Sequence, residues 1–357
     1  MIGRRLQLAR KARGLSLRDL ADRAGEVSAQ AIGRYERDEM NPSSRVLLAL
    51  CRALEIAPEY LLASGGVQLA GVQYRKKHDF RARDAAAVEA QVLSASERYL
   101  EIEDLLAMAE SFAPPRGFPV AAPSMESSES AARALRDAWN LGLDPIPNLT
   151  EFLEERGLKV LSVRLPDKVS GFQAAVSRRS GSPFPIVVVN ADEPGERQRF
   201  TLAHELAHLL LVPNDEEARE ALCHRFASAF LMPAESLFEA LGRSRRTLSM
   251  GELFLLKPLF GVSAQAIVRR AKDLGVISEG VYGSLFREFS RRGWRRREPN
   301  PLVPENPGRF LRLCFHAVSE GLISESRGAE LLEVPTREFR AKLDNIGTTG
   351  RAADARL

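Results

Sequence analysis

Residues 1–65 are divided into short amphipathic segments by residues that start and end helices. Apolar positions recur every three or four residues, as on one face of a helix, and Gly14 and Gly25 interrupt this pattern. Ser16 and Ser28 stand where a helix N-cap is expected. We therefore predict an all-α domain over residues 1–65. The first helix is expected to end near Ala12. Four further helices are expected over residues 17–24, 28–35, 46–54 and 58–62.

Residues 66–127 contain two different patterns, first a helical one and then a proline-rich one. Residues 84–108 are rich in alanine, glutamate and leucine and contain no glycine or proline, which predicts one long amphipathic helix or a helix pair broken near Ser94. Prolines then cluster in residues 111–127, where periodic apolar positions are few. We interpret residues 66–127 as a helical connector followed by a proline-rich linker.

A mixed pattern follows in residues 128–240, which we predict to be a separate domain. Two helical segments, three short β-branched runs and two further helical segments follow one another. This order predicts an α+β unit with a small sheet. The β-branched runs are 158–164, 172–177 and 185–190, and the last two helical segments are 196–212 and 216–231.

The C-terminal region, residues 241–357, is again mainly helical in its pattern. It contains an arginine-rich cluster at 287–298, and a disordered tail is expected after about Asp344. Taken together, the chain is predicted to be mainly α with a small β-sheet (α+β), with an all-α domain first.

Composition narrows the class of protein. With 357 residues, 45% hydrophobic and 27% charged, the chain has a globular composition and room for two or three domains. No apolar run is long enough for a membrane span, and the N-terminus lacks the apolar region of a secretory signal. Three scattered cysteines exclude a disulfide scaffold and favour the cytoplasm. The net charge of +4 is too small to indicate nucleic-acid binding by itself.

The strongest chemical motif is His204-Glu205-Leu206-Ala207-His208, inside an apolar stretch that predicts a buried helix. Histidines four positions apart share a helix face, so both imidazoles can bind one ion. Zinc accepts imidazole nitrogen, prefers four ligands and keeps one position for water in catalytic sites. Glu205 can take a proton from that water and pass it to a leaving amine. Zn²⁺ is therefore expected, with Mn²⁺ left open because ligand chemistry discriminates poorly between them.

A third protein ligand is expected on the following helical segment. Glu220 and His224 are four positions apart there and share one face. We predict that Glu220 is the ligand and that His224 orients it through a hydrogen bond. Two alternatives stay open: His224 is itself the ligand, or Glu220 is an ordinary solvated acid.

Residues 130–340 resemble the ImmA/IrrE-type zinc metallo-endopeptidases. The resemblance rests on RDAWNLGLDPIPNL, on IVVVN followed by RxRFTLAHELAHLLL, and on EALCHRFASAFLMP. It implies a zincin-like domain in which His204, His208 and Glu220 bind zinc and Glu205 is the general base. It also implies a protein substrate, often a transcriptional repressor. The sequence departs from the family at Cys223-His224, where Ala-Asn or Ala-Asp is more usual.

Residues 2–62 resemble the Xre/Cro-type helix-turn-helix family through RxxRGLSLRDLA and VSxxAIGRYER. The resemblance implies that a recognition helix enters the major groove of double-stranded operator DNA. Ser28, Gln30 and Arg34 are then expected at base edges, and Arg18 and Arg37 at phosphates. A palindromic operator would further imply a homodimer.

Two functions from different classes fit these motifs. The first is a DNA-binding regulator whose zinc-dependent endopeptidase domain cleaves a partner repressor, with Arg197, Arg199 and His224 as candidate oxyanion stabilisers. The second is a non-catalytic regulator that uses the metal domain as a sensor or interaction module. An intact Glu205 favours the first, because a structural zinc site needs no general base. The arginine cluster at 287–298 is interpreted as a solvated face, with nucleic-acid contact as the alternative.

Overall fold

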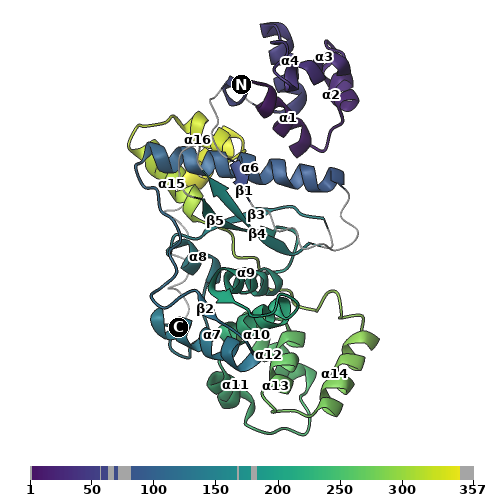
Figure 1. Ribbon diagram of the computed structural model, residues 1–357, viewed down its shortest axis with the longest axis vertical. Helices are drawn as coiled ribbons and strands as arrows, with labels where there is room; N and C mark the ends of the chain where they lie inside the picture. Colours follow the sequence, from purple (N-terminus) through teal and green to yellow (C-terminus); the bar gives the residue numbers. More distant parts are fainter. Residues whose placement is uncertain are drawn as a thin grey trace. The chain divides into compact units, whose positions relative to one another are not determined.

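A computed structural model describes residues 2–56, 58–62, 68–70, 82–166, 169–177 and 183–345 (Figure 1). The chain forms two compact units. Unit 1 comprises Met1–Glu110, Ala175–Phe184 and Pro307–Leu357, and unit 2 comprises Ser111–Ala174 and Pro185–Asn306. The predicted fold class is confirmed, because short strands accompany a mainly helical chain. The predicted domain boundaries stay a prediction.

Unit 1 begins with the predicted five-helix domain. A capping box starts the second helix, in which Asp19 N donates to Ser16 Oγ and Ser16 N donates to Asp19 Oδ2. Gly25 ends that helix with a φ of 68°, which a glycine adopts without strain. Leu20 and Ile32 are fully buried in the small core. The helices are α1 (Ile2–Ala12), α2 (Leu17–Ala24), α3 (Ala29–Glu36), α4 (Ser44–Leu54) and α5 (Pro58–Leu62).

The rest of unit 1 is built on a single long helix, α6 (Ala82–Leu105). The alternative of a helix pair broken near Ser94 is therefore wrong. Arg309 of α15 donates to Glu103 of α6 at 2.5 Å, which joins the C-terminal helices to α6. Strand β1 (Gln68–Ala70) pairs antiparallel with Ala175–Ser177. The C-terminal helices are α15 (Arg309–Ser319), α16 (Glu325–Leu331) and α17 (Thr336–Asn345); the predicted disordered tail lies almost entirely outside the described residues.

The three predicted strands lie in the order β4, β5, β3, and unit 2 contains β3, residues 171–174 of β4 and residues 185–190 of β5. Strands β3 and β5 are parallel, with Val160 opposite Val187. A short strand pair, β2 with β6, lies apart from this sheet and was not predicted. The proline-rich residues 111–127 belong to unit 2 and contain β2. The strands are β2 (Val120–Ala121), β3 (Lys159–Val163), β4 (Gly171–Ser177), β5 (Phe184–Asn190) and β6 (Leu211–Val212).

The helices of unit 2 enclose a largely apolar core next to this sheet. Helix α9 packs closely on the sheet at Gly171, where a β-carbon would lie 2.6 Å from Cγ2 of Thr201. Within the described residues no single helix has the length and apolar composition of a membrane span; only the bent pair α12–α13 passes when both helices are taken together. The helices are α7 (Met125–Ala138), α8 (Leu149–Glu154), α9 (Gly195–Leu210), α10 (Arg219–Leu231), α11 (Ala234–Leu241), α12 (Met250–Phe260), α13 (Ala264–Asp273) and α14 (Glu279–Arg291).

Candidate functional site

Helix α9 carries the two predicted histidine ligands and the predicted general base. Most of its residues are buried, including His204, Glu205 and the apolar residues between the histidines. No side chain caps its N-terminus; Gly195 N donates instead to Leu302 O at 2.9 Å, and Leu302 N donates to Glu196 Oε2 at 2.9 Å. These two hydrogen bonds and the close contact at Gly171 fix the position of α9, and hence of its histidines.

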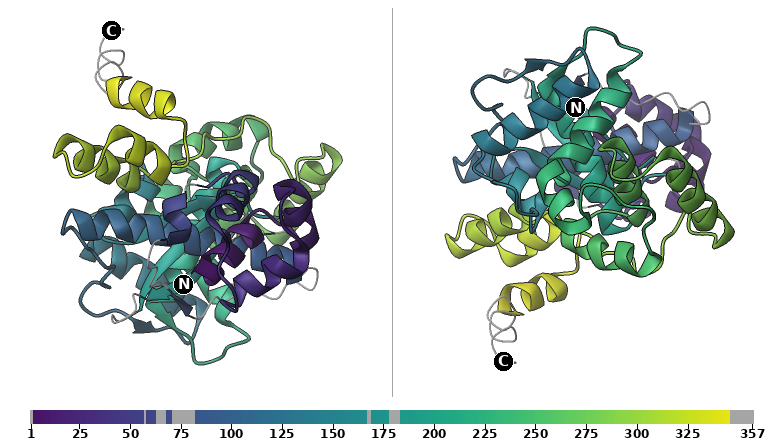
Figure 2. Two further views of the ribbon diagram at one scale, coloured as in Figure 1. Left: turned by 90° about the horizontal axis from the view of Figure 1, so that it is seen from above. Right: turned by 90° about the horizontal axis from the view of Figure 1, so that it is seen from below.

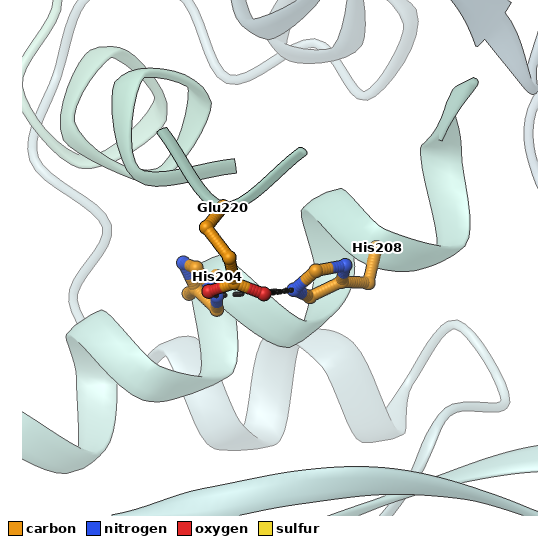
Figure 3. Close-up of side chains that lie close together, drawn as sticks. All are labelled: His204, His208 and Glu220. Carbon is orange, nitrogen blue, oxygen red and sulfur yellow. Dashed lines mark hydrogen bonds and ion pairs between the residues drawn. The ribbon is translucent and has the colours of Figure 1, made fainter. Parts of the chain in front are cut away.

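Helix α10 brings Glu220 to the two histidines, as predicted (Figure 3). The Nε2 atoms of His204 and His208 lie 3.1 Å apart. Glu220 Oε2 lies 3.7 Å from His204 Nε2, and Glu220 Oε1 lies 3.5 Å from His208 Nε2. The three side chains therefore direct two nitrogens and a carboxylate at one point.

The spacing of these atoms fits a zinc ion. Zinc–nitrogen and zinc–oxygen bonds are about 2.0–2.2 Å, so two ligands of a tetrahedral ion are roughly 3.4 Å apart. The three separations in this site lie on both sides of that value. Glu220 keeps 46% of its side chain exposed, whereas the two histidine side chains are almost buried. The ion would thus be approached by solvent or substrate from the Glu220 side, as a catalytic site requires.

Helix α10 is held in place by arginines from two neighbouring helices. Arg136 of α7 is buried and donates to Phe230 O at 2.7 Å, near the C-terminal end of α10. Arg270 of α13 is fully buried and donates to Met232 O at 3.0 Å while it also pairs with Glu129. Both arginines satisfy carbonyl groups at the end of α10 that have no partner within the helix.

Cys223, on the turn of α10 after Glu220, contacts the far side of one histidine ring. Its sulfur lies 3.5 Å from His208 Nδ1, and the side chain is buried. When Nε2 of His208 binds an ion, the ring proton is on Nδ1, and this N–H donates a hydrogen bond to the sulfur of Cys223. Such a contact sets the tautomer and the ring orientation of a metal ligand. Cys223 is thus a positioning residue for His208, a role that the sequence did not predict.

We expect Cys223→Ala to lower the affinity for zinc about 10–100-fold, the usual cost of losing an outer partner of a ligand. Cys223→Ser should keep more of the affinity, because its hydroxyl oxygen can accept the same proton. Zinc affinity is measured by competition with a chromophoric chelator. Cys51→Ala, at a buried cysteine of the N-terminal domain, is the matched control. Equal affinities for the Cys223→Ala and Cys51→Ala proteins would refute the positioning role.

His224 was predicted to orient Glu220, with a ligand role as the alternative. Its ring lies against that of His204, with centroids 4.5 Å apart, and stacks on Phe200 at 5.7 Å. The predicted orienting role toward Glu220 stays a prediction. The group of potential ligands found among the described residues contains His204, His208 and Glu220 but not His224. His224 is exposed and next to a ligand, which keeps it a candidate for contacting substrate.

The two arginines named as oxyanion candidates have other roles. Arg199 pairs with Glu305 and donates to Ile146 O at 2.6 Å and to Pro147 O at 3.3 Å. Arg197 pairs with Glu193 at 2.7 Å and donates to Ser170. Arg199 is committed to holding α8 and residues 302–306 beside α9. Of the three candidates, His224 is the one whose ring contacts a predicted metal-ligand histidine, His204.

The predicted DNA contacts all lie on the exposed surface of the helix-turn-helix domain. Ser28 Oγ caps α3 by accepting from Ala31 N at 3.2 Å, which uses one of the two acceptor positions of its hydroxyl oxygen. Arg37 pairs with Glu39 at 2.6 Å, which reduces the charge it offers to phosphate. Gln30 and Arg18 are exposed, and Arg34 is 3.9 Å from Glu39. Gln30, at the start of α3, is exposed and stays a predicted base contact.

Comparison with known proteins finds two family matches. Residues 6–61 match the helix-turn-helix family, and residues 153–272 match the IrrE N-terminal-like domain of peptidase family M78. The chain is 36% identical over 86 residues to the radiation response metalloprotease IrrE of Deinococcus deserti, across 19% of the chain and 31% of that protein. It is 36% identical over 73 residues to IrrE of Deinococcus radiodurans, across 16% and 22%.

A third relative matches as well. The chain is 36% identical over 81 residues to repressor protein C2 of Salmonella phage P22, across 23% of the chain and 37% of that repressor. The chain thus spans less than two fifths of the length of each of these curated relatives.

Proposed function

We propose that this chain, which carries a DNA-binding helix-turn-helix domain and an IrrE-like metalloprotease domain, is a transcriptional regulator that cleaves a partner repressor protein. The observation that carries the proposal is the convergence of His204, His208 and Glu220 beside a buried Glu205. Two nitrogens and a carboxylate, with one side open, are the ligand set of a hydrolytic zinc site.

Each residue of the site has a separate role in the proposed hydrolysis of a peptide bond. His204, His208 and Glu220 would hold the ion, which when bound supplies the positive charge that polarises a scissile carbonyl and acidifies a water. Glu205 takes the proton from the attacking water and delivers it to the leaving amine. Burial of Glu205 keeps bulk water away from this proton, and Cys223 keeps the His208 ring in one orientation.

The partner repressor is identified by comparing cells that make the protein with cells that make the Glu205→Gln variant. We expect one DNA-binding protein to be shorter in the first cells and intact in the second, with a new N-terminus that marks the cut. Absence of any protein whose termini depend on Glu205, together with intact operator binding, would favour the non-catalytic regulator.

We also propose that α3 reads operator DNA through Gln30, which can form two hydrogen bonds to adenine. We expect Gln30→Ala to lower the affinity for a selected operator by about 10–100-fold and to relax the preference at one base pair. The operator is selected from random duplexes with the full-length protein, and binding is measured by fluorescence anisotropy. Arg37→Ala is the control, because its ion pair with Glu39 predicts a small loss with unchanged preference. A Gln30→Ala protein with the parental sequence preference would refute this contact.

A further inference from the structure

A strongly basic surface lies at the end of α14, and the proposed function makes no use of it. Six arginines stand within residues 287–297, and all six are exposed. We call this set the arginine surface. Its members are Arg287, Arg291, Arg292, Arg295, Arg296 and Arg297.

Acidic residues do not neutralise the arginine surface. Glu288 is the one acid in residues 287–297, so the segment has a net charge of +5, six arginines minus one glutamate. Hydrogen bonds from Arg291 and Arg292 hold the pKa of Glu288 below its ordinary value, so this single carboxylate is shared by two of the six. Pairs of opposite charge at i,i+3 or i,i+4 are usual on a solvated helix face, and within residues 287–297 Glu288 is the one acid available for them.

The next acid along the chain faces the interior. Glu298 is buried and accepts from Lys257 Nζ at 3.2 Å and from the backbone amides of Ala264 and Gln265. These bonds hold the backbone in place immediately after Arg297, and the preceding arginines therefore lie next to a fixed part of the chain. Within the described part of the chain, Arg287, Arg296 and Arg297 make no ion pair.

Aromatic rings hold several of the cations in place. The guanidinium of Arg295 lies 4.7 Å from the ring centre of Phe286, and that of Arg292 lies 4.8 Å from Trp294. Tyr282, one turn before Phe286, has Lys272 Nζ of α13 at 5.0 Å from its ring. Helices α13 and α14 lie side by side (Figures 1 and 2), and Lys272 also pairs with Glu279 at 2.8 Å. Side chains ordered in this way lose less entropy when they bind a ligand.

We infer that the arginine surface of unit 2 binds the phosphate backbone of nucleic acid without reading its sequence. Guanidinium groups match phosphate oxygens in a two-pronged geometry that lysine lacks, and this segment uses arginine alone. Half-buried aromatic rings between arginines also suit sugar and base contacts. The same chain carries a helix-turn-helix domain, so nucleic acid is already an expected partner of this protein. The inference does not depend on the peptidase activity.

The test uses full-length protein with Gln30→Ala and Arg34→Ala, which weaken binding through α3. In this background, Arg295, Arg296 and Arg297 are replaced by alanine. The probe is a labelled duplex of unrelated sequence, and affinity is measured by anisotropy between about 50 and 200 mM salt. Each lost phosphate contact lowers the slope of log affinity against log salt by about 0.9. We expect the triple substitution to reduce this slope by about 2–3 and to weaken binding at the lowest salt.

The matched control replaces Arg116, Arg133 and Arg164, three exposed arginines of the same unit, and changes the net charge equally. Its salt slope should equal that of the parent. The double variant Arg296→Ala/Arg297→Ala, which leaves the Arg295–Phe286 contact intact, should lower the slope by about 2 and guards against a folding defect. Parental DNA binding by the triple variant, or equal losses in both triple variants, would overturn the inference. Binding to phosphatidylglycerol vesicles that depends on these arginines, with DNA binding unaffected, would overturn it in favour of a membrane surface.

Discussion

Replacing Glu205 by glutamine is expected to abolish cleavage of the partner repressor while zinc stays bound. Glutamine has nearly the same volume and fits the buried position on α9, but its amide cannot accept a proton from water. Loss of a positioned general base costs about 10²–10⁴-fold in rate. The first-order cleavage rate is measured with enzyme in excess over the repressor, and zinc content is determined on the same samples.

The zinc content of the Glu205→Gln protein shows whether a loss of cleavage comes from lost proton transfer or from lost metal. A Glu205→Gln protein that holds one zinc per chain and does not cleave assigns the loss to proton transfer. Cleavage at the parental rate with zinc bound would remove Glu205 from the mechanism, although the metal site would stand. Loss of zinc from the variant would instead mean that Glu205 supports the ligands.

Replacing Glu220 by glutamine is expected to remove zinc itself. The amide keeps the size of the side chain but lacks the negative charge, and the ion would be left with two neutral imidazoles. We expect zinc affinity to fall by more than about a hundredfold, beyond the 10–100-fold that follows loss of an outer partner. Cleavage should fall with zinc occupancy and return in part when zinc is added in excess.

Glu216→Gln is the matched control for Glu220→Gln, because Glu216 precedes α10 by a few residues and pairs only with Arg219 at 2.8 Å among the described residues. Its zinc affinity should equal that of the parent. If Glu220→Gln binds zinc as tightly as Glu216→Gln, Glu220 is not the third ligand. His224→Ala would then be tested for loss of zinc, since His224 lies against His204.

Local patterns predicted the elements that carry the chemistry. Two histidines four positions apart share a face in any α-helix, so their convergence follows from the motif alone. Strands β3, β4 and β5 and the helices of the N-terminal domain also follow from local spacing and capping residues. Strands β1, β2 and β6 were missed, because two or three residues are too short for a pattern of alternation.

Contacts between residues far apart in the sequence could not be predicted from local patterns. Arg199 was a candidate oxyanion stabiliser, yet its guanidinium pairs with Glu305 and donates to two carbonyl groups. The buried pairing of Lys257 with Glu196 joins positions far apart along the chain. The contact between Cys223 and His208 likewise depends on the rotation of α10 against α9.

The sequence by itself predicted a helix-turn-helix domain and a helix with two candidate metal-binding histidines and an adjacent carboxylate. It also limited the third ligand to two candidates, Glu220 and His224. The tertiary structure decided which of those candidates lies nearest to the histidines, because packing of α10 on α9 brings the Glu220 carboxylate to both imidazoles and places the His224 ring on that of His204. It also left the arginines of residues 287–297 exposed while it buried Glu298. Periodicity specifies which face of a helix a residue occupies, and only packing between helices specifies what that face meets.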